Sequence, residues 1–239
     1  MALAVLRKQD GLVTDALLPA REAVFARYRD LREIGKRHHE AVLKLIPSDA
    51  MLRQAHRLGL AQGRSFVVDN MDDLFYVYDL AIHTASPDRS RAIDRYAGRS
   101  RFAADSDEAL VLEAMRAAQF AILAVERRHE TIGLIATDLI RDREVWLVDI
   151  GLESSMAEGS VFATRLFAPE HFCMTAGINV PFNLGMLEDI QAELPRRLCE
   201  RPLPELIDNR HFAEAIYRVA LADGITNDIV YRDLPDDDT

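Results

Sequence analysis

Cysteine is scarce in this chain, and long apolar runs are missing. The two cysteines, Cys173 and Cys199, are too few for a disulfide framework or for a zinc site with four thiolate ligands. No stretch approaches the roughly 18 consecutive apolar residues of a membrane span. Charged residues also occur within the first ten positions, where a signal peptide would build its apolar core. The sequence therefore predicts a cytoplasmic protein that does not enter a membrane.

Lysine is rare as well. Of the 29 basic residues, only Lys8, Lys36 and Lys44 are lysines, and the others are arginines. Arginine is the better residue for bidentate recognition of anions. Because arginine is used uniformly along the whole chain, codon bias in a GC-rich genome explains the preference better than selection for anion binding.

What is present is an ordinary globular composition. The 239 residues are 49% hydrophobic and 28% charged, which allows one large domain or two small ones. The net charge of −10 is uneven, because residues 1–64 hold 12 Lys and Arg against 7 Asp and Glu, whereas residues 65–239 hold 17 against 32. Most of the surface should repel nucleic acid, and a polyanion would have to dock on the amino-terminal helices.

A long helix is predicted over residues 20–46, with Pro19 at its first position. Its apolar stripe repeats every seven residues, in a row made of Leu17, Val24, Leu31, His38 and Leu45. This spacing is typical of a helix that packs lengthwise against another helix. The partner is either another helix of the same chain or a second copy of this one, and about three heptads do not decide between them.

Further helices are predicted on both sides of a β-rich segment. Ser48 can cap a short helix that Gly59 or Gly63 ends. Helical periodicity also marks residues 70–84, 106–118, 184–200 with a break near Pro195, and 210–222.

From residue 119 the apolar period changes to two. Short β-prone runs follow one another without helices between them: QFAILAVE, TIGLIATDLI, EVWLVDI, SVFATRLF and HFCMTAGI. Such a succession predicts an antiparallel meander, which usually curls into a barrel so that its edges are not exposed. The fold class expected is α+β, with a helical segment 1–118, a small antiparallel β-barrel or curled sheet 119–182, and carboxyl-terminal helices 183–239, packed as one unit.

The β-rich segment contains Asp138-Leu139 before a turn, then Glu144-Val145-Trp146, Gly159, Arg165-Leu166 and Gly177. With these motifs it resembles the small β-domain of a family of poorly characterised bacterial proteins, some of which end in a zinc-binding SEC-C tail. Two features depart from the family pattern, because Arg141-Asp142-Arg143 replaces a glycine turn and the cysteines of the tail are missing. The resemblance implies a fold and supplies neither a metal nor an activity.

An acidic and histidine-containing helix face is the strongest candidate for chemistry. If residues 70–84 are helical, Asp72, Asp79 and His83 lie in one stripe at spacings of seven and four. Two carboxylates and an imidazole there could hold a divalent cation and activate water for hydrolysis. The simpler interpretation is the solvated face of an amphipathic helix.

Basic residues of the amino-terminal helices are the second candidate. Phosphates of RNA or DNA could bind to a face made of Arg27, Arg32, Lys36, Arg37 and Arg53. His38 belongs to the apolar row, so we expect it to be a core histidine with its hydrogen bonds satisfied. Acidic residues also alternate with the basic ones, which is typical of a solvated helix face.

Motifs of nucleophilic, nucleotide-binding and zinc-protease sites do not occur, since the chain has no G-x-S-x-G, P-loop, G-x-G-x-x-G or H-E-x-x-H. The sequence therefore favours a non-catalytic cytoplasmic interaction or regulatory protein without a cofactor, which contacts a protein partner or itself through the helix 20–46. The alternatives are a metal-dependent hydrolase using Asp72, Asp79 and His83, and a nucleic-acid-binding protein.

Overall fold

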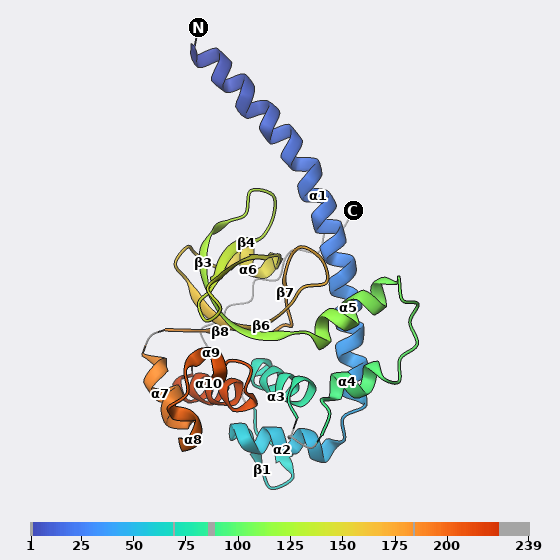
Figure 1. The fold of residues 1–239 in the computed structure, drawn as a ribbon, viewed down its shortest axis with the longest axis vertical. Coiled ribbons are helices and arrows are strands. Elements are labelled where there is room, and N and C mark those ends of the chain that lie inside the picture. The colour runs from blue at the N-terminus through green and yellow to red at the C-terminus, as the bar shows by residue number, and fades with distance from the viewer. Residues whose placement is uncertain (1, 69, 86–88, 184, 225–239) are drawn as a thin grey trace.

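A computed structural model describes residues 2–68, 70–85, 89–183 and 185–224, apart from the side chains of residues 2–19, 71 and 72. The acidic run near the carboxyl end lies outside these residues. The helices are α1 (Ala2–Lys44), α2 (Ser48–Leu58), α3 (Met71–His83), α4 (Ala92–Ala97), α5 (Asp107–Arg116), α6 (Ile150–Ser155), α7 (Met186–Glu193), α8 (Arg196–Cys199), α9 (Leu203–Leu206) and α10 (Arg210–Asp223). Figure 1 shows a curled sheet with α2, α3 and α10 below it and α1 along one side.

The predicted curled antiparallel sheet is confirmed. Its strands are β3 (Gln119–Arg128), β4 (Leu134–Asp138), β5 (Arg143–Leu147), β6 (Val161–Phe167), β7 (Met174–Thr175) and β8 (Val180–Pro181). They pair in the order β5-β4-β3-β6-β7, and β8 also pairs with β6. At the end of β5, Leu147 forms a parallel bridge with Cys173, which directly precedes β7. The sheet therefore curls until its two outer strands meet, between helices at both ends of the chain.

Two of the predicted strands are shorter than expected. The run EVWLVDI leaves the sheet after Leu147, because the side chain of Asp149 accepts a hydrogen bond from the backbone N–H of Leu152 at 3.2 Å and starts α6. The run HFCMTAGI contributes only the two residues of β7. A separate hairpin of β1 (Ala61–Gln62) and β2 (Ser65–Phe66), which the periodicity did not predict, follows α2.

Both faces of the central strand β3 are buried, which explains its almost continuous apolar run. Phe120 and Ile122 pack with residues of α3 and α10, whereas Ala121, Leu123 and Val125 face the interior of the curled sheet. Alternate side chains of one strand thus fill two cores. The helical side of the sheet is the side on which the candidate site lies.

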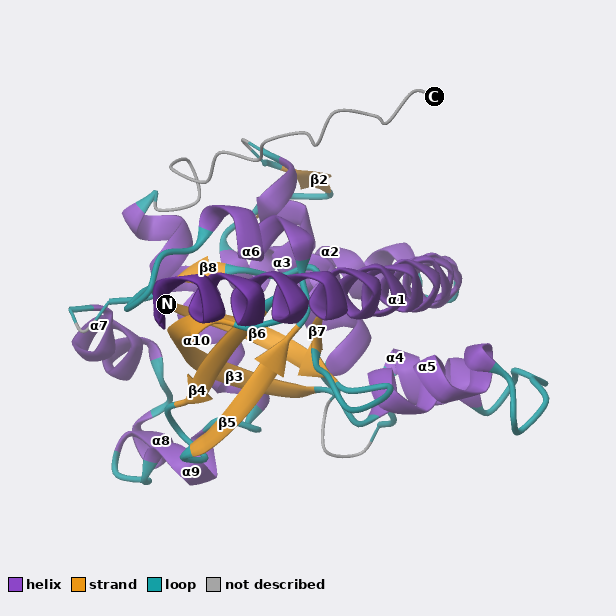
Figure 2. Cartoon of the chain, turned by 90° about the horizontal axis from the view of Figure 1, so that it is seen from above, coloured by secondary structure: helices purple, strands orange, loops and turns teal. Residues whose placement is uncertain are grey.

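The prediction that the long helix begins at Pro19 is wrong. α1 begins at Ala2 and continues through Pro19. The helix therefore tolerates the loss of one backbone hydrogen bond, because proline has no N–H to donate. Leu31 and Val42 are fully buried against residues of α4 and α5 within the same chain. Figure 2, a view from above, shows α1 beside the sheet, with α4 and α5 near the carboxyl-terminal part of the helix.

Helix ends follow local capping signals. Asn70 and Asp73 form a reciprocal capping box at the start of α3. Asn209 caps α10, which Gly224 ends in a left-handed conformation, as predicted. The predicted break near Pro195 separates α7 from α8. These caps therefore set where α3 and α10 begin, at Met71 and Arg210.

Candidate functional site

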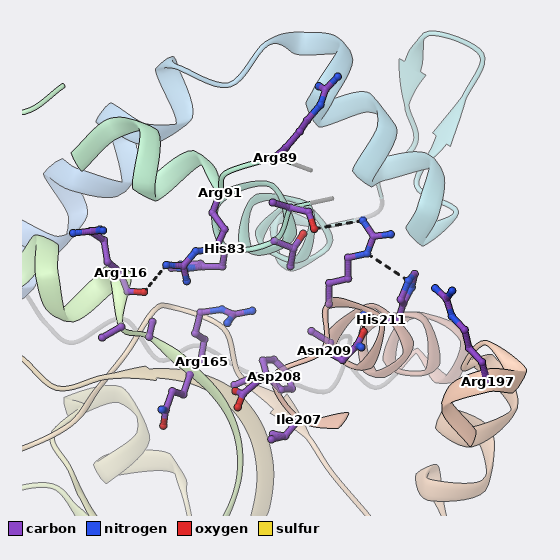
Figure 3. A pocket seen from close by; sticks show the side chains of 18 residues that line it. His83, Arg89, Arg91, Arg116, Arg165, Arg197, Ile207, Asp208, Asn209 and His211 are labelled. Atoms are coloured by element: carbon purple, nitrogen blue, oxygen red, sulfur yellow. Dashed lines mark hydrogen bonds between the residues drawn. The ribbon is translucent and has the colours of Figure 1, made fainter. Parts of the chain in front are cut away.

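A cavity of about 640 Å³ opens where the end of α3, the junction of α5 with β3, and the start of α10 meet (Figure 3). Its lining includes six arginines: Arg89, Arg91, Arg116, Arg165, Arg197 and Arg210. Among the described residues of the lining, Asp208 supplies a carboxylate, and it already forms an ion pair with Arg141 at 2.8 Å. A strongly cationic cavity thus lies in a chain whose net charge is −10.

A buried ion pair forms the floor of this cavity. Arg165 in β6 donates two hydrogen bonds to Asp79 in α3, at 2.6 and 2.9 Å, and the hydroxyl of Tyr217 donates a third at 2.8 Å. Burial favours the neutral carboxyl, but the charge and hydrogen bonds of Arg165 outweigh burial and lower the pKa of Asp79. Burial, followed by the nearby Asp79 charge, raises the pKa of Tyr217 well above its ordinary value. The pair is therefore ionised, and it fixes the orientation of the Arg165 guanidinium.

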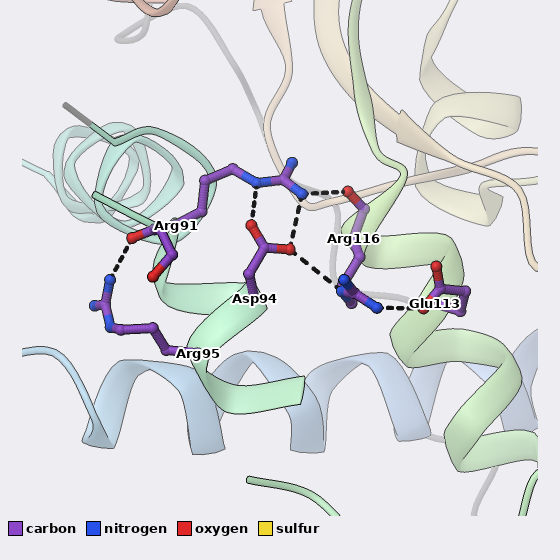
Figure 4. A network of polar contacts seen from close by, with 6 residues as sticks. Arg91, Asp94, Arg95, Glu113 and Arg116 are labelled. Atoms are coloured by element: carbon purple, nitrogen blue, oxygen red, sulfur yellow. Dashed lines mark hydrogen bonds and ion pairs between the residues drawn. The ribbon is translucent and has the colours of Figure 1, made fainter. Parts of the chain in front are cut away.

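A second carboxylate fixes two more of the arginines. Asp94 in α4 accepts hydrogen bonds from Nε and Nη2 of Arg91, at 2.7 and 3.0 Å, and from Nε of Arg116 at 3.2 Å (Figure 4). Arg91 Nη2 also donates to the Arg116 carbonyl at 2.9 Å, and Arg116 Nη1 donates to Glu113 at 2.7 Å. The hydrogen bonds from Arg91 and the charges of both arginines lower the pKa of Asp94. One carboxylate thus holds two guanidinium groups side by side.

Each of these three arginines keeps an unused donor group. A guanidinium carries five N–H donors. Within the part of the chain that the structure describes, Nη1 of Arg91, Nη2 of Arg116 and Nη1 of Arg165 form no hydrogen bond. Guanidinium groups that are already held in place lose little conformational freedom when they bind an anion.

The remaining arginines differ in how they are held. Arg89 and Arg197 form no hydrogen bond or ion pair with any described residue, and both are exposed. Arg210 donates to the carbonyl of Ala85 at 3.5 Å and to Nε2 of His211 at 3.4 Å. Burial and then the charge of Arg210 lower the pKa of His211, so this imidazole is neutral near pH 7.

His83 is the buried polar group of the cavity that lacks a partner. It is only 6% exposed, it lines the cavity, and neither ring nitrogen forms a hydrogen bond with the described residues. Burial, together with the charge of Arg165, keeps its pKa well below the ordinary value. The neutral ring offers one donor and one acceptor, and leaving both unsatisfied is costly.

Two of the three predicted metal ligands, Asp79 and His83, have described side chains. Asp79 and His83 lie one turn apart in α3, but Asp79 binds Arg165 and Tyr217, and the side chain of Asp72 lies outside the described residues. Among the described side chains, no three His, Cys, Asp or Glu residues lie close enough to hold a metal ion. The metal-dependent hydrolase stays a prediction, and metal analysis of the purified protein tests it.

Four of the five residues predicted to bind nucleic acid have a partner within the chain. Their partners are Asp107 and Glu170 for Arg27, the carbonyl of Thr175 for Arg32, Glu33 for Lys36, and Glu108 for Arg37. Nucleic-acid binding stays a prediction, which a steep loss of affinity with salt would support.

His38 is a core histidine, as expected: it is 2% exposed, and its ring nitrogens lie 3.1 Å from the Tyr96 hydroxyl and 2.9 Å from the Glu108 carbonyl.

A family model covers almost the whole of this fold. The model of a family of unknown function, DUF7986, matches residues 23–224, which include the sheet and all six arginines of the cavity. The chain belongs to DUF7986. No curated protein and no solved structure matches the chain. Membership of DUF7986 agrees with the expected resemblance to a poorly characterised family. The family description gives no activity for the cavity.

None of the helices in the described ranges has the length and apolar character needed to span a membrane.

Proposed function

We propose that this protein is a non-catalytic binding protein, with an interaction or regulatory role, whose arginine-lined cavity holds a phosphorylated small molecule. The observation that carries the proposal is the set of spare donors: three fixed guanidinium groups, each with an unused terminal nitrogen, around one cavity. Asp79, Asp94 and Glu113 balance the charge of these three guanidinium groups, so the charge of the lining that no described carboxylate pairs with is that of Arg89 and Arg197.

A phosphate group suits this arrangement better than a single carboxylate does. Phosphate presents several acceptor oxygens in different directions, so Arg91 just before α4, Arg116 in α5 and Arg165 in β6 can donate to it at the same time. The start of α10 adds the positive end of a helix dipole. The cavity volume of about 640 Å³ lies within the usual range for small-molecule sites.

Calorimetric titration with pyrophosphate tests this function. The double variant Arg89→Gln with Arg197→Gln removes two charges without leaving a carboxylate unpaired, so the fold should be unaffected. We expect its affinity for pyrophosphate to fall roughly tenfold or more, since charge-assisted hydrogen bonds are lost. Arg64→Gln is the matched control, because Arg64 is 91% exposed, does not line the cavity and has only a 3.9 Å contact with Asp49.

Two results would remove the proposal. One is the absence of pyrophosphate binding at low salt, and the other is an equal loss of affinity in Arg64→Gln and in the double variant. Release of inorganic phosphate from the bound compound would contradict the non-catalytic part alone.

We further propose a cytoplasmic location, a relationship to the bacterial proteins with a small β-domain and, in some members, a SEC-C tail, and self-association through the helix 20–46. In support of self-association, α1 extends well beyond the body of the protein at its amino end (Figure 1). Light scattering over a range of concentrations tests it, and a monomer mass throughout would remove it. Leu31 is unsuitable as a probe because it is fully buried within its own chain.

A further inference from the structure

The arginines and the neutral His211 that line the cavity fall into two sets that come from different parts of the chain. The first set, Arg91, Arg116 and Arg165, is supplied by the segment before α4, by α5 and by β6. The second set, Arg197, Arg210 and His211, is supplied by α8 and the first turn of α10. Figure 3 shows Arg91, Arg116 and Arg165 on one side of the view and Arg197 and His211 on the other.

Less strongly charged side chains line the space that belongs to neither set. Phe120, Ile207 and Ala213 supply apolar surface, and Asp208 and Asn209 supply oxygen atoms. Such a lining suits a carbon frame that carries hydroxyl groups, and it would disfavour a third phosphate because of the Asp208 carboxylate.

We propose that the ligand is a bisphosphate, a small polyol or sugar with one phosphate bound by each set. This proposal rests on the proposed function, and it adds the number and separation of the anionic groups. The first set binds one phosphate with donors fixed by Asp79 and Asp94. The second set, at the amino end of α10, binds the other.

A series of probes with one or two phosphates tests the distance between the two proposed phosphate positions. We would titrate the full chain, at constant ionic strength, with inorganic phosphate, with ethyl phosphate, and with straight-chain diol bisphosphates of two to six carbons. Binding of one phosphate raises the effective concentration of the other when the spacer fits. We expect the best bisphosphate to bind roughly a hundredfold more tightly than ethyl phosphate, with weaker binding by both shorter and longer spacers.

One variant tests whether the second set binds the second phosphate. Arg197→Gln should reduce the affinity of the best bisphosphate roughly tenfold while the affinity for ethyl phosphate stays within about twofold, because the first set is intact. Arg64→Gln again serves as the control.

The outcomes separate this inference from the proposed function. If ethyl phosphate binds as tightly as every bisphosphate, or if Arg197→Gln weakens neither, the two-phosphate ligand is wrong although the cavity still binds anions. If neither phosphates nor bisphosphates bind, both proposals fail.

Discussion

Two arginine-rich regions of this protein have similar charge and different chemistry. On α1, Arg27 binds two carboxylates and Arg32 donates to a backbone carbonyl, so their charge ties the helix to the rest of the fold. Around the cavity, Arg91 and Arg165 also bind carboxylates, yet each keeps an unused nitrogen. Unused donors occur in both regions, since Arg32 uses only Nη1 among the described contacts; the cavity differs because its guanidinium groups are fixed by carboxylates and still keep a free terminal nitrogen.

The difference depends on how a carboxylate engages the guanidinium. Asp79 and Asp94 occupy the Nε edge of Arg165 and Arg91, which is one side of a planar fork. The far nitrogen then points away from the carboxylate. A carboxylate on one edge therefore orients the guanidinium group and leaves the far nitrogen able to donate to another acceptor.

The largest effect is expected from breaking the buried pair. Arg165→Met leaves the Asp79 carboxylate buried with only the Tyr217 hydroxyl as a partner, which should lower the free energy of unfolding by about 3–5 kcal/mol. Urea denaturation followed by circular dichroism measures this.

The double variant Asp79→Leu with Arg165→Met is the control for that experiment. It removes both charges, so it should be more stable than Arg165→Met alone. A single variant as stable as the wild type would show that the pair does not contribute to the fold.

Acid should destabilise the contact between α1 and α3, where His39 of α1 lies beside His83 of α3. Burial lowers the pKa of His39 to about 4 and that of His83 well below 6.5, and the rings of these two residues lie 6.2 Å apart. From pH 6.5 downward the unfolded chain binds protons that the folded chain does not, so stability falls as pH falls. We expect a loss of about 2 kcal/mol per histidine between pH 7 and pH 5.

Denaturation curves at several pH values test this expectation, with His83→Gln as the comparison. The variant should show a shallower loss of stability over the same range, since one of the two groups no longer titrates. Equal slopes in the wild type and the variant would contradict the assignment to His83.

The smallest effect is expected on α1. Arg27→Gln leaves Asp107 and Glu170 without their partner, but all three side chains are partly exposed, so the loss should be about 1 kcal/mol. Pyrophosphate affinity should not change, because Arg27 does not line the cavity. A variant that binds pyrophosphate much more weakly would erase the distinction between the two regions.

Much of the fold could be predicted from local signals. The change of apolar period at Gln119 coincides with the first residue of β3, and Asn209 and Gly224 bound α10 as their capping preferences require. The region of Asp149 shows where such signals fail, because an apolar run typical of a strand was ended by a helix cap.

The site was harder to predict because it is built from distant residues. Helical spacing singles out Asp79 and His83, but the partner of Asp79 is Arg165, 86 residues later in the chain. One signal was available: Arg165 interrupts an apolar strand, VFATRLF, and a charge in a fully buried strand needs an opposite charge nearby. Nothing in the sequence indicated which carboxylate that would be.

The bridge between Leu147 and Cys173 has a consequence for behaviour at high concentration. An open sheet of this length would present a row of free backbone donors and acceptors to its neighbours. Because the end of β5 meets the chain just before β7, some of these backbone donors and acceptors form hydrogen bonds within the molecule. Disrupting the bridge, for example with Cys173→Pro, should therefore promote edge-to-edge aggregation before it unfolds the helices.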